Sequence, residues 1–271
     1  QYGSDAIAGV INIVLDDADQ GGRAYASYGE YTEGDGETYN VDLNGGFSLG
    51  DGGFVNTTFN YRDRGRTNRA GKQGACAYGG CMDTDGNGID EPGDPREITF
   101  DRGSFRIGDA ESEQYAFIVN AGYSLGAGEL YGFLTYSNRD NQSGAFYRNP
   151  SSGADAYLDD GDNVVPDGFL PLINSEIEDL SFNAGYRMDF DNGLGMDISY
   201  TNGSNEIDYD TSNSINYSFV NYLKFGEGLS DDEIRSSIPR SAEAYGLELG
   251  LQTFNLDFNQ ALGDLALAYG F

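Results

Sequence analysis

The sequence predicts an all-β fold built from antiparallel strands. Apolar and polar residues alternate with a period of two, the alternating segments run to about twelve residues, and short and long connections follow one another in turn. A period of two places successive side chains on opposite faces of a strand. Long strands joined alternately by tight turns and long loops are typical of a transmembrane β-barrel.

The first two strands are predicted over residues 23–33 and 38–49. In the second, Tyr39, Val41 and Leu43 share one face, whereas Asn40 and Asp42 share the other. One apolar and one polar face indicate that the strand separates two environments. The same alternation predicts further strands around residues 115–125, 180–190, 194–200, 245–258 and 265–271.

The connections are predicted from their composition and length. Gly, Asn and Asp accept the backbone angles of hairpins, which predicts tight turns at residues 50–53, 126–128, 191–193 and 263–264. Long polar loops are predicted at about residues 67–112, 141–178 and 208–242. Because strand direction reverses at every connection, these turns and loops lie at opposite ends of the sheet. Near Thr253 the apolar positions change phase, which predicts a β-bulge.

Two interpretations of this pattern differ in what surrounds the apolar face. A soluble β-sandwich also alternates, but its strands are usually about five or six residues long and its connections lack the strict alternation in length. Aromatic residues near the strand ends resemble the girdles of membrane barrels. They are Tyr39, Tyr61, Tyr115, Tyr136, Tyr186, Tyr200 and Tyr245. The pattern therefore favours an antiparallel transmembrane β-barrel.

The charge balance excludes several functions. Among 271 residues, 45 are acidic and 15 are basic, which gives a net charge of -30. A chain this negative lacks the basic surface that binds phosphates, so no nucleic-acid partner is expected. The absence of His excludes a His-based catalytic triad and a His-ligated metal site. No other catalytic constellation is strong enough to nominate, and we do not expect an enzyme.

Residues 2–15 carry the most specific motif, Tyr-Gly-Ser-Asp-Ala-Ile-Ala-Gly-Val-Ile-Asn-Ile-Val-Leu. This segment closely resembles the end of the plug domain in TonB-dependent receptors of the bacterial outer membrane. In that family, Tyr-Gly, a small residue, a variable residue and Ala precede Gly-Val-Ile-Asn-Ile. The sequence departs from many members after residue 14, where they carry Thr-Lys or similar. The matching positions, which the resemblance makes structural, include Tyr2, Gly3, Ala6, Gly9, Val10 and Asn12.

The resemblance implies a domain layout and a function. Residues 1–20 would be the C-terminal end of the plug and a linker, and residues 21–271 would be about eight to nine of the 22 strands of a barrel. The chain would then be a fragment of a longer receptor. Such receptors take up a scarce nutrient (a siderophore, vitamin or glycan) with energy relayed by the TonB complex. The implied partners are that complex, through the missing N-terminal region, the solute, and outer-membrane lipid.

The first long loop contains Cys76 and Cys81. In a loop that would be extracellular, after export through an oxidising compartment, a local disulfide is expected. The rival interpretation is a thiolate metal site, which needs more ligands than two Cys can supply in a chain without His.

Directly after the cysteines, residues 83–94 match the calcium-loop pattern of oxygen ligands at positions 1, 3 and 5, Gly at 6 and an acid at 12. The ligands would be Asp83, Asp85, Asn87 and Asp94, with the carbonyl of Ile89. Position 12 is Asp rather than Glu, so only modest affinity is expected. A flexible acidic loop is the alternative, because these residues are common in turns. If calcium binds, a structural or adhesive outer-membrane barrel is the alternative function.

The other two long loops differ in character. Residues 149–179 contain eight acids and no Lys or Arg. Residues 230–238 begin with Ser-Asp-Asp-Glu, which predicts a short helix with a capping box. Aromatic residues in these loops either contact a ligand such as a sugar or pack the loops together. They are Tyr147, Tyr157, Phe169, Tyr217 and Tyr222.

Overall fold

In the computed structural model, the described residues are 13–72, 76–79, 81, 85, 93–152, 158–263 and 265–271. They form one antiparallel sheet of nine strands, each paired with its neighbours in sequence. This confirms the all-β, antiparallel prediction. The strands are β1 (Gly22–Gly29), β2 (Thr38–Ser48), β3 (Gly53–Arg64), β4 (Glu111–Leu125), β5 (Gly128–Gly144), β6 (Leu172–Asp189), β7 (Leu194–Ser212), β8 (Ala242–Leu262) and β9 (Leu265–Gly270).

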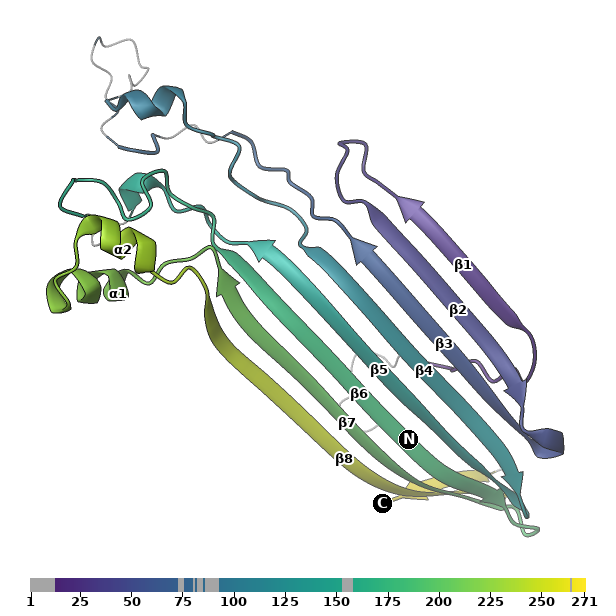
Figure 1. The fold of residues 1–271 in the computed structure, drawn as a ribbon. Coiled ribbons are helices and arrows are strands. Elements are labelled where there is room, and N and C mark those ends of the chain that lie inside the picture. Colours follow the sequence, from purple (N-terminus) through teal and green to yellow (C-terminus); the bar gives the residue numbers. More distant parts are fainter. Residues whose placement is uncertain are drawn as a thin grey trace.

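The sheet is open, and β1 and β9 are its edge strands. Figure 1 shows the long strands side by side, with short turns at one end and long loops with small helices at the other. Among the helices in the described ranges, none combines the length and hydropathy needed to cross a bilayer. The helical elements are η1 (Gly50–Gly52), η2 (Pro95–Ile98), η3 (Pro150–Ser152), α1 (Tyr217–Asn221), the π-helical η5 (Tyr222–Gly226) and α2 (Asp231–Ser237).

The tight turns fall where the composition predicts them. The chain reverses through η1 between β2 and β3, and through two- to four-residue connections after β4 and β6. Gly126 and Gly193 have φ values of 64° and 78° in these turns. A side chain at either position would strain the backbone, which explains why the hairpins turn at these residues.

The long connections are loop A (residues 65–110), loop B (145–171) and loop C (213–241). Loops B and C are shorter than predicted, because β5, β6 and β7 extend past the end of the apolar alternation. Asp140 lies opposite Glu176, and Glu176 lies opposite Asp208. Strand pairing depends on backbone hydrogen bonds, which polar residues form as well as apolar ones. The strands therefore continue through these polar residues.

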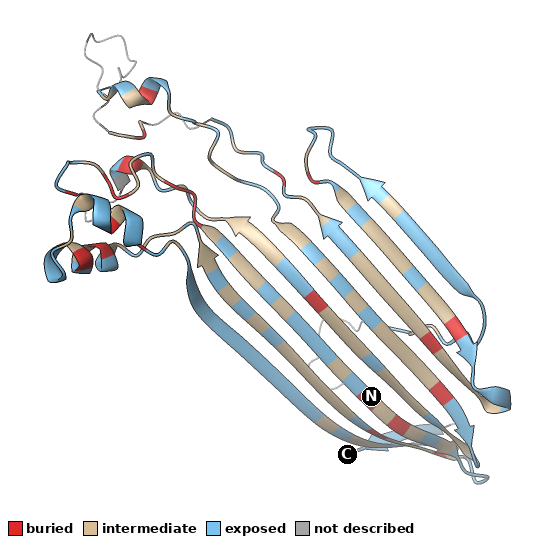
Figure 2. Cartoon of the chain, in the orientation of Figure 1, coloured by how far each residue is buried: buried red, intermediate tan, exposed pale blue. Residues whose placement is uncertain are grey.

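The register gives the sheet one apolar and one polar face. Leu43, Phe59, Phe117, Tyr136 and Leu180 lie directly opposite one another across five strands and define the apolar face. Burial alternates along the same strands (Figure 2). The polar face carries ten polar residues that the alternation assigns to it: Asn40, Asp42, Asn44, Asn56, Asn60, Arg62, Asn120, Asn183, Arg187 and Asp197.

Polar-face side chains are hydrogen-bonded between strands. The Asn44 amide donates to Asn56 Oδ1 at 2.6 Å, and the Asn183 amide donates to Thr201 Oγ1 at 2.8 Å. Asn60 donates to the carboxylate of Asp42. These bonds satisfy amide N–H groups that the neighbouring strands partly bury.

On the apolar face, the hydrophobic residues form a belt that slides along the strands. On β2 the belt runs from Tyr39 to Phe47, and on β8 it runs from Phe254 to Leu262. Through the register, Phe47 lies in line with Phe254. The belt therefore covers the same length along both strands. From β2 to β8, across six successive strand pairs, it shifts along the strand direction by that same length.

Toward the loops, the apolar face becomes acidic beyond the belt. One row across β3 to β7 consists of carboxylates, each directly opposite the next: Asp63, Glu113, Asp140, Glu176 and Asp208. Like charges that face one another across strands are destabilising. All five lie on strand ends that project beyond the belt, and all five residues are exposed.

The predicted bulge near Thr253 is wrong. Thr253 pairs regularly with Thr201, and the register shifts instead between Tyr209 and Asp210. Without a bulge at Thr253, the apolar residues of β8 change face there. Leu247, Leu249 and Leu251 lie on the polar face, opposite Ile207, Asn205 and Gly203 of β7. Tyr245 also lies on the polar face, unlike the other strand-end tyrosines that the sequence analysis grouped with it.

Cross-linking tests this register. With Ile207 opposite Leu247, oxidation of the Ile207→Cys/Leu247→Cys variant is expected to form a disulfide, because directly opposite side chains lie within bonding reach. A bulge at Thr253 would instead place Leu247 opposite Glu206. The Glu206→Cys/Leu247→Cys variant is the control and is expected to stay reduced. Preferential linking of the control pair, read by mass spectrometry, would contradict the register.

Candidate functional site

The segment that precedes β1 lies against the polar face. The Asn120 amide donates to the backbone carbonyl of Asp16 at 3.0 Å, and the Asn56 amide donates to the carbonyl of Ala18 at 3.1 Å. Asn56 is 2% exposed. A Cβ at Gly46 would collide with the Ala18 carbonyl. Glycine is therefore required where the two backbones meet.

All but the last three residues of the plug-like motif (2–15) lie outside the described residues. Tyr2, Gly3, Ala6, Gly9, Val10 and Asn12 all belong to this group. What the structure does show is that the chain leaving the motif, residues 13–20, contacts the polar face of β2, β3 and β4 before β1 begins.

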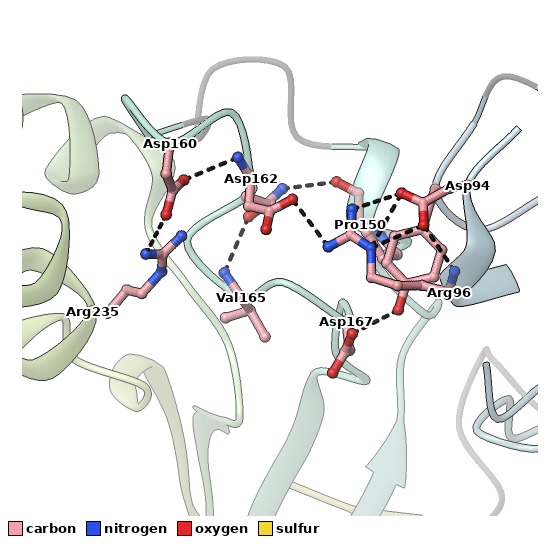
Figure 3. A network of polar contacts seen from close by, with 10 residues as sticks. Asp94, Arg96, Pro150, Asp160, Asp162, Val165, Asp167 and Arg235 are labelled. Carbon is pink, nitrogen blue, oxygen red and sulfur yellow. Dashed lines mark hydrogen bonds and ion pairs between the residues drawn. The ribbon is translucent and has the colours of Figure 1, made fainter. Parts of the chain in front are cut away.

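Loops A, B and C are joined by ion pairs (Figure 3). Arg96 of loop A contacts Asp162 of loop B at 3.0 Å. Asp160 of loop B contacts Arg235 of loop C at 2.6 Å, and Asp159 contacts Lys224 at 2.8 Å. The acidic side chains of loop B are therefore paired with basic side chains of loops A and C. Exposed ion pairs of this kind add little stability. Their main effect is to fix the positions of the three loops relative to one another.

Two carboxyls beside this network, Asp94 of loop A and Asp160 of loop B, have pKa values below their ordinary range. Hydrogen bonds from the Arg96 guanidinium, and then from its backbone N–H, hold the pKa of Asp94 below its usual value. The Arg235 guanidinium, and then the backbone N–H of Asp162, lower the pKa of Asp160. Both carboxyls therefore stay charged at neutral pH, and the Asp160–Arg235 pair between loops B and C weakens only as the pH falls through the lowered pKa of Asp160.

Loops B and C also share a small hydrophobic core. Val220, Leu223 and Ile234 of loop C pack with Leu158 and Val164 of loop B. The sequence predicts a capped helix here, and α2 confirms it: the Ser230 backbone N–H donates to the Glu233 carboxylate at 2.9 Å. This core, shown red within the helices in Figure 2, holds the two loops as one folded unit.

At the base of the loops lies a cavity of about 630 Å³. Loop A supplies Arg66 and Arg106, loop B supplies Tyr147 and Phe169, and loop C supplies Arg240. We call it the loop cavity. Tyr147 is held in place because its hydroxyl donates to the carbonyl of Asp167 at 2.8 Å and its ring lies 4.8 Å from that of Phe105. The cavity thus combines guanidinium donors with fixed aromatic rings.

The structure separates the loop aromatics that the sequence analysis grouped. Tyr147 and Phe169 meet in the loop cavity. Tyr217 lines a different groove beside Phe219, and Tyr222 stacks on Phe219 with ring centroids 5.9 Å apart. Tyr157 lies outside the described residues. Sequence reasoning missed Arg106 and Arg240, because no motif or spacing connects two arginines that are this far apart in the chain.

Cys76 and Cys81 are joined by a disulfide, with their Cα atoms 6.1 Å apart. Glu97 lies close to both sulfurs. Among the described residues, these three are the one group of potential metal ligands that lie together, and the disulfide removes the thiolates that a metal would need. Buried Glu97 instead accepts from Arg102 at 2.6 Å and from the backbone N–H of Tyr78 at 2.7 Å.

Of the five predicted calcium ligands, Asp83, Asn87 and Ile89 lie outside the described residues, whereas Asp85 and Asp94 lie within them. The Asp94 carboxylate is paired with the Arg96 guanidinium at 2.7 Å. A calcium ion that used Asp94 would compete with this pair. Calcium binding by this loop stays a prediction.

Comparison with known proteins adds no further assignment: no protein-family model matches the chain, and no curated protein matches it.

The shared core of loops B and C can be tested by truncation. Ile234 is 0% exposed, so Ile234→Ala is expected to destabilise the docked loops by about 2–5 kcal/mol. Ile98 of loop A is 78% exposed, and Ile98→Ala is the matched control, with an expected change within about 0.5 kcal/mol. Hydrogen exchange of α1 and α2 measures both. Equal protection in the two variants would contradict the shared core.

Proposed function

We propose that this chain forms part of the wall of a TonB-dependent receptor of the bacterial outer membrane, which takes up a scarce nutrient. The observation that carries the proposal is the sliding apolar belt. Its displacement is about 27 Å along the strands over six strand spacings of about 4.8 Å, which corresponds to a strand tilt of about 40°. Transmembrane barrels have this tilt.

The width of the belt also supports a membrane setting. From Tyr39 to Phe47 the belt covers about 27 Å along β2, which becomes about 21 Å along the barrel axis at this tilt. The apolar band of outer-membrane barrels is about 25 Å tall. Tyrosines such as Tyr39, Tyr61 and Tyr136 mark the loop-side border of the belt, as aromatic girdles do.

An open sheet with this belt needs further strands to close around a lumen, because unpaired edges do not persist in lipid. The polar face would line that lumen. Residues 13–20, which contact the polar face through Asn56 and Asn120, would then enter from the plug that the motif at residues 2–15 resembles. Loops A, B and C would lie outside the cell and receive the solute.

Membrane insertion is tested by moving a charge between faces. Leu134 lies in the belt on the apolar face, and Thr135 lies on the polar face. Leu134→Arg is expected to cost about 2–4 kcal/mol of barrel stability, whereas Thr135→Arg costs much less. Heat-modifiable migration of the full-length receptor from outer membranes of a Gram-negative host measures folding. The proposal fails if both variants fold equally well.

Energy coupling is tested in cells. Strains lacking this receptor, or lacking TonB, are supplied with a panel of labelled ferric siderophores, vitamin B12 and oligosaccharides. We expect the same solute to be lost in both strains and restored when the receptor is supplied in a TonB-positive background. A structural or adhesive barrel would show no uptake defect in common with the TonB mutant.

A further inference from the structure

The loop cavity concentrates positive charge in a strongly acidic protein. Acids outnumber bases by 45 to 15 in the chain. Arg66, Arg106 and Arg240 nevertheless line one cavity, and none of the described residues that line it is acidic. Most neighbouring cations, such as Arg96 and Arg235, are neutralised by carboxylates. The cavity therefore differs in sign from its surroundings.

The three arginines keep donor capacity for a ligand. Within the described ranges, no hydrogen bond or ion pair involves the Arg106 guanidinium. Arg240 donates only to uncharged oxygens, the Ser214 carbonyl at 3.0 Å and Asn213 Oδ1 at 2.6 Å. Arg66 has one long contact, 3.4 Å to Glu111. Burial, and then the charge of Arg66, lower the pKa of Arg106, and the carboxylate of Glu111 partly opposes this shift.

Aromatic and apolar surface borders these donors. The Arg240 guanidinium lies 5.2 Å from the centroid of the Phe169 ring, so its fork is held against a flat face. The Tyr147 ring is fixed by its own contacts on the same cavity. A ligand in this cavity would contact both guanidinium groups and aromatic rings.

On the polar face of the sheet, basic residues and apolar residues also lie on different strands. Arg62, Gln114 and Arg139 form one row across β3, β4 and β5, and Arg64 lies in the next row toward the loops. On β7 and β8 the corresponding rows hold Ile207 with Leu247 and Tyr209 with Tyr245. The apolar face at this height carries the row of carboxylates instead. The two faces of one sheet thus have opposite charge beyond the belt.

We propose that the loop cavity binds an organic anion that carries several carboxylate or phosphate groups on an apolar ring or chain. Arg66, Arg106 and Arg240 bind its charged groups, and Tyr147 and Phe169 contact its apolar part. Arg62 and Arg139 carry positive charge further along the polar face, so the same anion can pass toward the lumen. Binding in the cavity stands on its own, whereas passage rests on the proposed transport function.

The test uses the full-length receptor purified in detergent and a matched pair of probes. Benzene-1,3,5-tricarboxylate carries three charges on a ring, and benzene-1,3,5-tricarboxamide has the same shape without charge. Titration calorimetry at low salt is expected to show binding of the tricarboxylate and at least tenfold weaker binding of the amide. Added salt is expected to weaken tricarboxylate binding, because the contacts are ionic.

Variants locate the site. Arg106→Gln/Arg240→Gln is expected to weaken tricarboxylate binding by about tenfold to a hundredfold, since charge-assisted hydrogen bonds are lost. Arg23→Gln/Arg187→Gln removes the same charge outside the cavity and is expected to leave affinity within about twofold. Arg106→Lys keeps the charge but not the planar fork, so it retains part of the affinity. Heat-modifiable migration confirms that each variant is folded.

Three results would overturn the proposal: no tricarboxylate binding to the folded receptor at millimolar concentration, equal binding of the amide, or equal weakening in both double variants. Each of these leaves membrane insertion and TonB-dependent uptake untouched. Conversely, loss of the uptake result with intact tricarboxylate binding would remove the transport function and keep the anion site.

Discussion

The strand register is the constraint on which the rest of this structure depends. Because successive side chains alternate between faces, a slip of one residue in any ladder would exchange the two faces of that strand. The pairs Phe59–Phe117 and Asn56–Asn120 show both faces kept in phase across β3 and β4. The apolar belt, the hydrogen-bonded polar face and the acidic row beyond the belt all follow from this one alignment. So does the position of residues 13–20, which are bound by polar-face amides.

Beyond the sheet, ion pairs and a small hydrophobic core, rather than strand register, hold loops A, B and C together. Loop B contains five Asp and one Arg, so its carboxylates would repel one another if they were not paired. Its acids are instead paired with Lys224, Arg235 and Arg96 from the adjoining loops. Apolar residues of loops B and C also pack together around Ile234. The three loops therefore act as one unit, and the loop cavity exists only because they are held at fixed distances.

The separation of charge between the faces connects these two levels. Carboxylates occupy the apolar face beyond the belt, and arginines occupy the polar face at the same height. A protein of such negative net charge can still offer a basic path to an anion when its few cations are collected on one surface, because local potential depends on nearby charges more than on the total. This arrangement connects the loop cavity with the polar face, and it makes an anion the expected solute of the proposed transport function.

The sequence by itself determined the strands, the tight turns and the two faces, because period-two alternation and turn chemistry are local properties that any neighbouring strand must respect. It also determined the capped helix α2. It misjudged the ends of β5 to β7 and the phase change at Thr253, since backbone pairing continues through polar residues and tolerates a change of face. Only the tertiary structure decided which loop residues meet. Arg106 and Arg240 are 134 positions apart, and long-range packing of three loops, rather than any local pattern, places both with Tyr147 and Phe169 on one cavity.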